Sequence, residues 1–377
     1  MKKIFLVNCL IVFGFMTNVF NATADTLRVR IYSTNKIDKL EVVQSFGTYY
    51  LGGSKSLKKQ DKISLELKES KIAVFLNDSL LQTQDSVKIS SKDLKCFFQI
   101  NPVGLKSRRY DNDLLVKLDK DKKHLLLINI VDEDNYLAAV VQSEAGGASD
   151  NVEFFKVQAI CCRSYMMRFK NKHAKDGYNL CDDVNCQVYL SRANKTECRE
   201  GAVSSSGEII VDSNDNIIET LFYSNSGGQT AKAKDVWGKD VSYLQSVTDS
   251  FSLGQPNATW EKDIKEKDWI NYFRNKGIDV KNTDNKKEIL NFSQKDGRKD
   301  KIFNIPLTQV RKDFNLKSTY FDVVRWGSII KLKGRGYGHG VGMSQEGAAA
   351  MCDEGYEYWE VIDFYYKDVK IKNIKEE

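Results

Sequence analysis

Proline is scarce in this chain, with 3 residues among 377, and glycine numbers only 24. Collagen-like and proline-rich linker architectures are therefore excluded. A strong excess of one charge sign is also missing, because 57 basic residues face 51 acidic ones and the net charge is +6. Because this excess of positive charge is small, the composition gives no reason to expect a nucleic-acid partner.

Apolar residues are nevertheless plentiful enough for a packed core. Hydrophobic residues make up 41% of the chain and aromatic residues 11%, which excludes disorder throughout. The length predicts about two domains. No internal repeat is visible in the sequence.

Residues 1–24 have the features of a secretory signal peptide. Two lysines precede a mostly apolar run over residues 4–20, and Ala22 and Ala24 supply an A-x-A cleavage pattern. The run is shorter than the ~20 apolar residues that span a membrane comfortably, so we expect cleavage rather than anchoring. The sequence therefore predicts an exported protein of the periplasm, cell envelope or medium, with no transmembrane span after cleavage.

The cysteines do not form the pattern of a disulfide scaffold. Eight occur, and cleavage of the signal peptide would remove Cys9, which leaves an odd number spread over a long chain. Cys161 and Cys162 lie in an apolar, helix-like run, where we interpret them as small buried hydrophobic residues.

Residues 25–131 are predicted to form a β-rich N-terminal region. Apolar and polar residues alternate with period two over 27–31, 62–67 and 113–118, and residues 125–131 are almost continuously apolar. Polar clusters separate these runs, as expected of turns.

Helical spacing begins near residue 134. Residues 135–145 and 152–170 have the helical period, and the second run is apolar on two faces, which is typical of a buried helix. Charges of both signs over about 261–300 predict a solvated helical insertion. Further strands are predicted at 208–211, 217–223, 301–306 and 328–333, and further helices from Ser344 and near 358–366. We therefore predict an α+β fold, with a mixed sheet and packed helices over residues 132–377.

Glu144 is the carboxylate in the most informative position. The i, i+3, i+4, i+7 spacing is met by Leu137, Val140, Val141 and Glu144. Glu144 therefore projects from the apolar face of its helix. A carboxyl group against apolar surface loses hydration and its pKa rises, as a general acid for a glycosidic oxygen requires. The alternative is a partly exposed glutamate at the end of the helix.

Arg163 lies inside the helix that is apolar on two faces. A buried guanidinium needs an anionic or carbonyl partner. The residues alone favour a structural ion pair over a role in binding a substrate.

A candidate metal site is formed by His173, Cys181 and Cys186. The spacings are His-x7-Cys and Cys-x4-Cys, and thiolate and imidazole suit zinc with a fourth position left open. Asp182 and Asp183 are nearby oxygen alternatives. A Cys181–Cys186 disulfide remains the other interpretation, because disulfides form after export.

Two loops of small residues, 336–348 and 224–230, are predicted to face each other across one cleft that holds Glu144. Residues 334–342 place glycine at every second position, which lets the backbone approach a ligand closely. His339 stands in this loop, and Ser344 can cap the helix that follows. Residues 224–230 form the second loop, directly after a strand pattern. The alternative for each loop is a tight turn.

Several longer stretches together resemble the SpoIID/LytB family, named for the stage II sporulation protein D and the amidase enhancer. They run in family order: YLAAVVQSE at 136–144, RSY at 163–165, CDDVNCQVY at 181–189, YSNSGGQT at 223–230, DVW at 235–237 and GYGHGVGMSQEGA at 336–348. The resemblance covers roughly residues 26–370. Ala145-Gly146 stands where the family usually has Met-Pro, and this changes the loop beside Glu144.

In sporulation members of this family, the glutamate that matches Glu144 is the catalytic acid of a lytic transglycosylase. Such enzymes cleave peptidoglycan glycan strands stripped of stem peptides, and zinc held by loop cysteines and a histidine occurs within the family. The resemblance thus implies glycan strands as substrate, zinc as cofactor, and substrate contacts from Arg163, Ser226, Gly227, Gly228, Gln229, Thr230, Tyr337, His339, Ser344 and Gln345.

Two functions follow from these observations. In a lytic transglycosylase one glutamate suffices, whereas ordinary glycosidases need two carboxylates; the sequence offers no second carboxylate in an equal position. The other function is a non-catalytic, glycan-binding enhancer of a separate N-acetylmuramoyl-L-alanine amidase. A purely structural, zinc-bearing envelope protein is a third interpretation.

Overall fold

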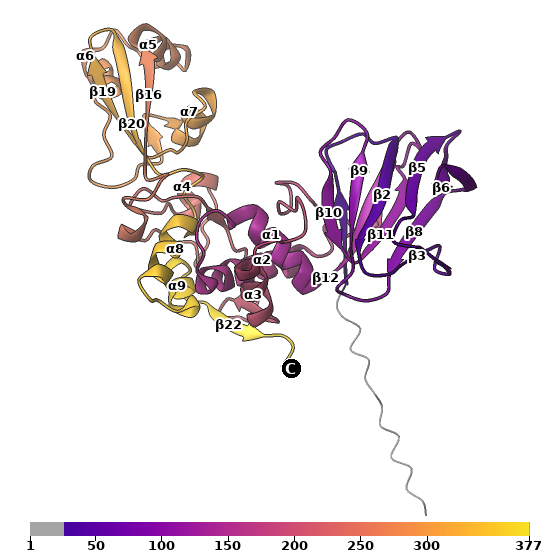
Figure 1. The fold of residues 1–377 in the computed structure, drawn as a ribbon. Helices are drawn as coiled ribbons and strands as arrows, with labels where there is room; N and C mark the ends of the chain where they lie inside the picture. Colours follow the sequence, from indigo (N-terminus) through magenta and orange to yellow (C-terminus); the bar gives the residue numbers. More distant parts are fainter. Residues whose placement is uncertain (1–25, 377) are drawn as a thin grey trace, which may run out of the picture.

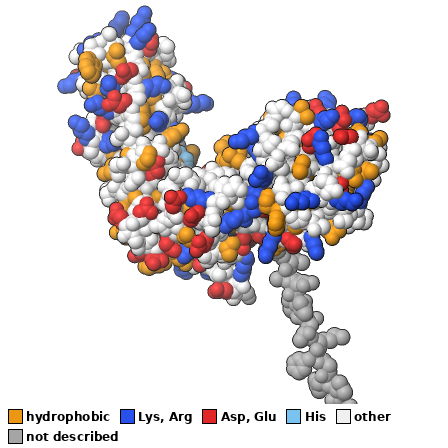
Figure 2. Space-filling view, viewed as in Figure 1, with side chains coloured by type: hydrophobic (Ala, Val, Ile, Leu, Met, Phe, Trp, Pro, Cys, Tyr) orange, Lys and Arg blue, Asp and Glu red, His pale blue; other side chains and the backbone are white. Residues whose placement is uncertain are grey.

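The computed structural model describes residues 26–376, and the predicted signal peptide lies outside this range. Three parts follow one another along the chain: a β-rich N-terminal part, a helical centre, and an insertion that leaves the centre and returns to it (Figure 1). Figure 2 shows a deep notch between the insertion and the N-terminal part. The predicted α+β fold with a β-rich N-terminal region is confirmed.

The N-terminal part consists of two sheets packed face to face. One sheet has the strand order β13-β1-β12-β11-β8-β3-β4, and the other has the order β10-β9-β2-β5-β6-β7. Alternate residues such as Val29, Leu40, Leu65 and Phe98 are buried, so the period-two pattern places the core between the sheets. The strands are β1 (Thr26–Ile31), β2 (Lys39–Phe46), β3 (Tyr49–Leu51), β4 (Lys55–Ser56), β5 (Lys62–Lys68), β6 (Lys71–Leu76), β7 (Ser79–Gln84), β8 (Ser86–Ser91), β9 (Phe97–Pro102), β10 (Arg108–Asp111), β11 (Asp113–Leu118) and β12 (Leu125–Asp132).

Strand β13 (Leu180–Cys181) ties the helical centre to the N-terminal sheet. It pairs in parallel with β1, with Val29 opposite Leu180 and Arg30 opposite Cys181. The segment that carries the predicted metal ligands is therefore fixed at a sheet edge.

The helical centre is built around α1 (Glu133–Ala145) and α2 (Val152–Phe169). Asp132 caps α1 by accepting hydrogen bonds from the amides of Asp134 and Asn135, which satisfies donors that the helix leaves free. Helix α2 is buried on several sides, as its two apolar faces predict. Around it lie η1 (Ala174–Asp176), α3 (Thr196–Ser204), β14 (Glu208–Val211), β15 (Phe222–Tyr223), α4 (Ala233–Trp237), η2 (Ser250–Ser252), β21 (Met343–Ser344), α8 (Gln345–Asp353), α9 (Tyr358–Tyr365) and β22 (Lys370–Asn373).

The insertion differs from the solvated helical segment that its charges predict. It is a small α/β unit, in which the antiparallel sheet β16-β20-β19 packs on helices and has a core of its own. Trp269 and Phe273 are fully buried. The two residues are spaced i and i+4, so they lie on one narrow apolar face of α5 that turns inward. The many charged residues around them made this face hard to recognise in the sequence. The elements are β16 (Thr259–Lys265), α5 (Glu266–Asn275), α6 (Thr283–Leu290), β17 (Lys301–Ile302), β18 (Ile305–Pro306), α7 (Leu307–Asp313), β19 (Phe321–Trp326) and β20 (Ile329–Arg335).

Across the described residues 26–376, none of the helices has the length and apolar character to cross a lipid bilayer.

Candidate functional site

Glu144 stands at the end of α1 and lines a cavity of about 430 Å³. Its Oε1 atom accepts a 2.7 Å hydrogen bond from the amide of Val188. Burial raises the pKa of the Glu144 carboxyl, and the Val188 hydrogen bond opposes this rise. The side chain is half-buried, so it combines a desolvated carboxyl group with access to the cavity.

Segments far apart in the sequence meet around this cavity. Helix α1 contributes Glu144, helix α2 contributes Tyr165, and the remaining walls come from residues 184–188, residues 219–222 and His339. Glu144 and His339 therefore share one cavity, although 195 positions separate them in the sequence, as their numbers give.

His339 lines the cavity, but both of its ring nitrogens are already engaged. Nδ1 accepts a hydrogen bond from the amide of Val341, so we assign the proton to Nε2, which donates to the carbonyl of Phe222; both distances are 3.1 Å. Burial lowers the pKa of His339 to about 4. The ring packs beside Tyr223 and Trp237. His339 therefore lies where the prediction of a substrate contact requires it, and that contact stays a prediction; its two ring nitrogens hold the cavity wall together.

The two loops of small residues do not face each other across a cleft, and this prediction is wrong too. They pack directly together, with the amide of Ser226 donating to the Ser344 hydroxyl and the Asn225 and Tyr337 backbones exchanging hydrogen bonds. A Cβ atom on Gly227 would lie 2.5 Å from the Arg335–Gly336 backbone. The glycines therefore permit contact between two backbones, not contact between a backbone and a ligand.

Most of the predicted substrate contacts are consequently structural. Ser226 donates to Asp249, the Thr230 hydroxyl accepts from the Val247 amide, and Ser344 caps α8 through the Gly347 amide. These three side chains are buried. The prediction that these three residues contact substrate is therefore wrong, because their polar atoms are buried and form hydrogen bonds inside the protein.

The remaining predicted contacts divide between structural and exposed positions. Gly228 donates to the hydroxyls of two buried serines, and Gln229 donates to Ser246 and accepts from the Arg298 amide. Gln345 donates to the Glu144 carbonyl at 3.3 Å, so it supports the end of α1 and does not face the cavity. Tyr337 is 44% exposed, outside the residues that line the Glu144 cavity.

Arg163 is fully buried, and the prediction that it binds substrate is wrong. Its Nε donates to Glu133 at 2.9 Å, and its terminal nitrogens donate to Asp134 and to the carbonyls of Ala202, Ser205 and Glu208. Every nitrogen of the guanidinium therefore has a partner inside the protein. The structural ion pair that the residues favour is confirmed.

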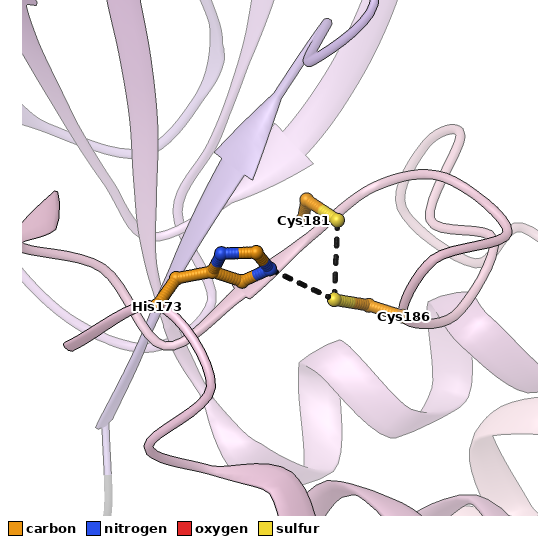
Figure 3. Close-up of side chains that lie close together, drawn as sticks. All are labelled: His173, Cys181 and Cys186. Carbon is orange, nitrogen blue, oxygen red and sulfur yellow. Dashed lines mark hydrogen bonds between the residues drawn. The ribbon is translucent and has the colours of Figure 1, made fainter. Parts of the chain in front are cut away.

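The side chains of His173, Cys181 and Cys186 meet in one cluster (Figure 3). The Cys186 Sγ lies 3.1 Å from the Cys181 Sγ and 3.5 Å from the His173 Nε2, and the three ligand atoms lie within 4.8 Å of one another. Both cysteines are free thiols. Two sulfurs and one imidazole nitrogen at these separations fit a zinc ion with a fourth position open.

The two aspartates near this cluster differ in their surroundings. Asp182 binds Arg108 and the amides of Tyr32 and Ser33, so its oxygens hold the sheet edge and not a metal. Asp183 accepts a hydrogen bond from the Cys181 thiol at 3.5 Å. Cys186 also lines the Glu144 cavity, so the cluster and the cavity share a wall.

Sequence reasoning missed one residue of the Glu144 cavity, Glu219, and one residue of a second cavity, Trp237. Glu219 lines the same cavity as Glu144, and it also lines a second cavity of about 510 Å³. Trp237 is 51% exposed and lines this second cavity. The strand-like run 217–223 contained a signal for Glu219: alternation turns Ile218 and Thr220 inward, as observed, and Glu219 outward.

Comparison with known proteins shows which family this part of the chain is similar to. Residues 121–212, which include Glu144 and the cluster of His173, Cys181 and Cys186, match the family model described as SpoIID, stage II sporulation protein. The chain is 28% identical over 257 residues to the stage II sporulation protein D of Bacillus subtilis (strain 168), covering 63% of this chain and 74% of that protein.

Two further relatives extend this likeness. An uncharacterized protein of Brachyspira hyodysenteriae is 26% identical over 317 residues, which is 81% of this chain and 80% of that protein. The amidase enhancer of Bacillus subtilis is 25% identical over 279 residues, which is 58% of this chain and 38% of that protein. The resemblance to the SpoIID/LytB family is thereby confirmed.

Proposed function

We propose that this relative of the SpoIID/LytB proteins is an exported lytic transglycosylase that cleaves peptidoglycan glycan strands, preferably strands without stem peptides. The relatives support a function connected with peptidoglycan. The finer assignment rests on one observation: Glu144 presents a desolvated carboxyl group to a cavity, with Oε1 held by the Val188 amide.

In the proposed reaction, Glu144 serves first as acid and then as base. Its proton passes to the glycosidic oxygen as the bond from that oxygen to C1 breaks, and the bonding electron pair goes to the leaving oxygen. The 6-hydroxyl of the same sugar then attacks C1, a bond forms between C1 and that oxygen, and the hydroxyl proton returns to Glu144. The products are a new chain end and a 1,6-anhydro sugar, and no water is consumed.

The surroundings of Glu144 suit this double role. Burial favours the neutral carboxyl group needed for the first proton transfer. The Val188 amide occupies Oε1, so the proton of the acid belongs on Oε2. The Gln345 amide on the Glu144 carbonyl supports the backbone at the end of the helix.

We further propose that His173, Cys181 and Cys186 hold a zinc ion. Bound there, zinc would act as a structural link between the segment after α2 and the segment that leads to Val188. The zinc cluster would thereby fix the position of the amide that binds Glu144.

A glycan-binding amidase enhancer is the second candidate function. The similarity to the amidase enhancer of Bacillus subtilis favours it, and so does the Ala145-Gly146 departure directly after Glu144. In this case a cell-wall amidase would be the protein partner, and the cavity would bind glycan without cleaving it.

One digestion separates the two candidates. Purified protein is incubated with denuded glycan strands and with intact peptidoglycan, and the products are analysed by mass spectrometry. Release of anhydro-ended fragments, faster from denuded strands, supports the transglycosylase. Glycan binding and stimulation of an added amidase, without such fragments, support the enhancer.

A further inference from the structure

We propose that Glu219 is a second catalytic carboxylate of the Glu144 cavity, and that it stabilises positive charge on the sugar ring during cleavage. This inference rests on the proposed transglycosylase function. It is drawn from the position of Glu219, which lines the same cavity as Glu144 although it comes from a different segment of the chain.

The backbone around Glu219 is held on both sides. Ile218 and Thr220 are buried at 1% exposure, and the Thr220 hydroxyl donates a 2.6 Å hydrogen bond to the carbonyl of Cys161 in α2. The amide of Glu219 itself donates a 3.1 Å hydrogen bond to the hydroxyl oxygen of Tyr243. Because its two neighbours turn inward, the Glu219 side chain turns toward the cavity from a fixed backbone, as pre-organised electrostatic stabilisation requires.

Glu219 and Tyr165 line the same cavity, and the charge of Glu219 acts on Tyr165. Burial raises the pKa of Tyr165, another lining residue, to about 12, and the charges of Cys186 and Glu219 contribute to that rise. Glu219 is half-buried and lines both cavities. The carboxylate is therefore available to a ligand.

Glu219 also stands where two cavities adjoin. It lines the second cavity together with Leu221 and Trp237, and Leu221 again belongs to both cavities. A glycan that extends from Glu144 toward the exposed ring of Trp237 passes over Glu219. A sugar ring of this glycan would then have the Glu144 acid on one side and the Glu219 carboxylate beside it.

The chemistry gives such a carboxylate a defined task. When the bond between C1 and the leaving oxygen breaks, positive charge develops on C1 and on the ring oxygen before the 6-hydroxyl attacks. A carboxylate beside the ring lowers the energy of this state without forming a bond or transferring a proton. Glu144 supplies the proton, and Glu219 remains unchanged throughout the reaction.

The test compares Glu219→Gln with wild type and with Glu200→Gln, a control at an exposed position of α3 outside both cavities. On denuded glycan strands we expect kcat to fall about 10²-fold or more in Glu219→Gln, with KM little changed, because the interaction exists mainly in the transition state. Glu219→Asp, which keeps the charge, should recover part of the rate. An unchanged kcat, or a change in KM alone, would overturn the inference.

A binding experiment tests the same role without turnover. Affinity for a cationic, N-acetylated iminosugar of the nojirimycin type is compared with affinity for neutral N-acetylglucosamine. We expect Glu219→Gln to weaken binding of the cation about 10- to 100-fold and to leave the neutral sugar unaffected. Equal effects on both sugars, or none on either, would overturn the inference. If wild type cleaves no glycan but its affinity for the cation depends on Glu219, the proposed function fails and the charge-recognising role of Glu219 stands.

Discussion

The amide of Val188 donates a 2.7 Å hydrogen bond to Oε1 of Glu144. Val188 follows the cluster residue Cys186 by two positions, and Cys181 of the same cluster lies in β13 on the N-terminal sheet. The backbone that fixes the carboxyl group of Glu144 is thus anchored at the cluster of His173, Cys181 and Cys186 and at a sheet edge. This connection joins the proposed chemistry, the proposed zinc site and the β-rich part of the chain.

The first prediction concerns Glu144 as the acid. Glu144→Gln keeps the shape of the side chain and an acceptor for the Val188 amide, but it cannot donate a carboxylic proton. We expect release of anhydro-ended fragments to fall at least 10²- to 10⁴-fold, while glycan binding and circular dichroism stay unchanged. The measurement is a timed digest of denuded strands. Equal rates in wild type and mutant would show that another group supplies the proton.

The second prediction concerns stability and pH. Burial raises the pKa of Glu144 in the folded protein above the value of about 4.3 that it has in the unfolded chain. Between these two pKa values the folded state binds more protons, so wild-type stability falls relative to Glu144→Gln as pH rises, and then levels off. Denaturant titrations of both proteins at several pH values measure this difference. A difference that is independent of pH would contradict the assignment of a raised pKa.

The third prediction concerns zinc. Wild type should contain about one zinc per chain, and Cys181→Ser should lose most of it, because the site has three protein ligands. Elemental analysis measures the metal, and Cys198→Ser, a buried cysteine outside the cluster, serves as control. Negligible zinc in all three proteins, together with loss of two free thiols in wild type, would favour the disulfide.

The fourth prediction concerns Arg163. Arg163→Met leaves Glu133 buried without its cation, and we expect the free energy of unfolding to fall by about 3–5 kcal/mol. The double variant Arg163→Met/Glu133→Gln should recover part of this loss, because the buried charge is then removed. Urea titrations give both values. A stable Arg163→Met protein with weaker glycan binding would instead restore the substrate-binding role.

The fifth prediction concerns Gly342, in one of the two loops of small residues that pack together, and uses Gly238 as a control. Gly342 and Gly238 share a positive φ, at 78° and 73°, but a Cβ on Gly342 would lie 2.1 Å from the Leu221 carbonyl oxygen, whereas Gly238 has open space. Gly238→Ala should cost about 1 kcal/mol of stability, from backbone strain. Gly342→Ala should cost clearly more and should also lower activity, since Leu221 lines the Glu144 cavity. Thermal melts and digests of both variants test this, and equal effects would argue against the clash.

Much of the fold could be predicted from local pattern. Period two placed strands at residues 27–31 and 113–118, and the 3.6 period placed helices close to α1 and α2. The insertion was the exception, because Trp269 and Phe273 are few among many charges and only their joint burial against β16, β19 and β20 reveals a core. A high density of charged residues indicates that one face of a helix is solvated, but it does not show whether a narrow apolar face is also present.

The sequence by itself determined the spacing of Glu144 on an apolar helix face and the choice of His173, Cys181 and Cys186 as neighbours. Both follow from short-range geometry, because helix period and loop length fix them. Only the tertiary structure decided that both ring nitrogens of His339 form hydrogen bonds with backbone atoms. It also decided that Glu219 lines the Glu144 cavity. Those outcomes depend on which distant segments meet, and the same glycines that could approach a ligand instead let two loops approach each other.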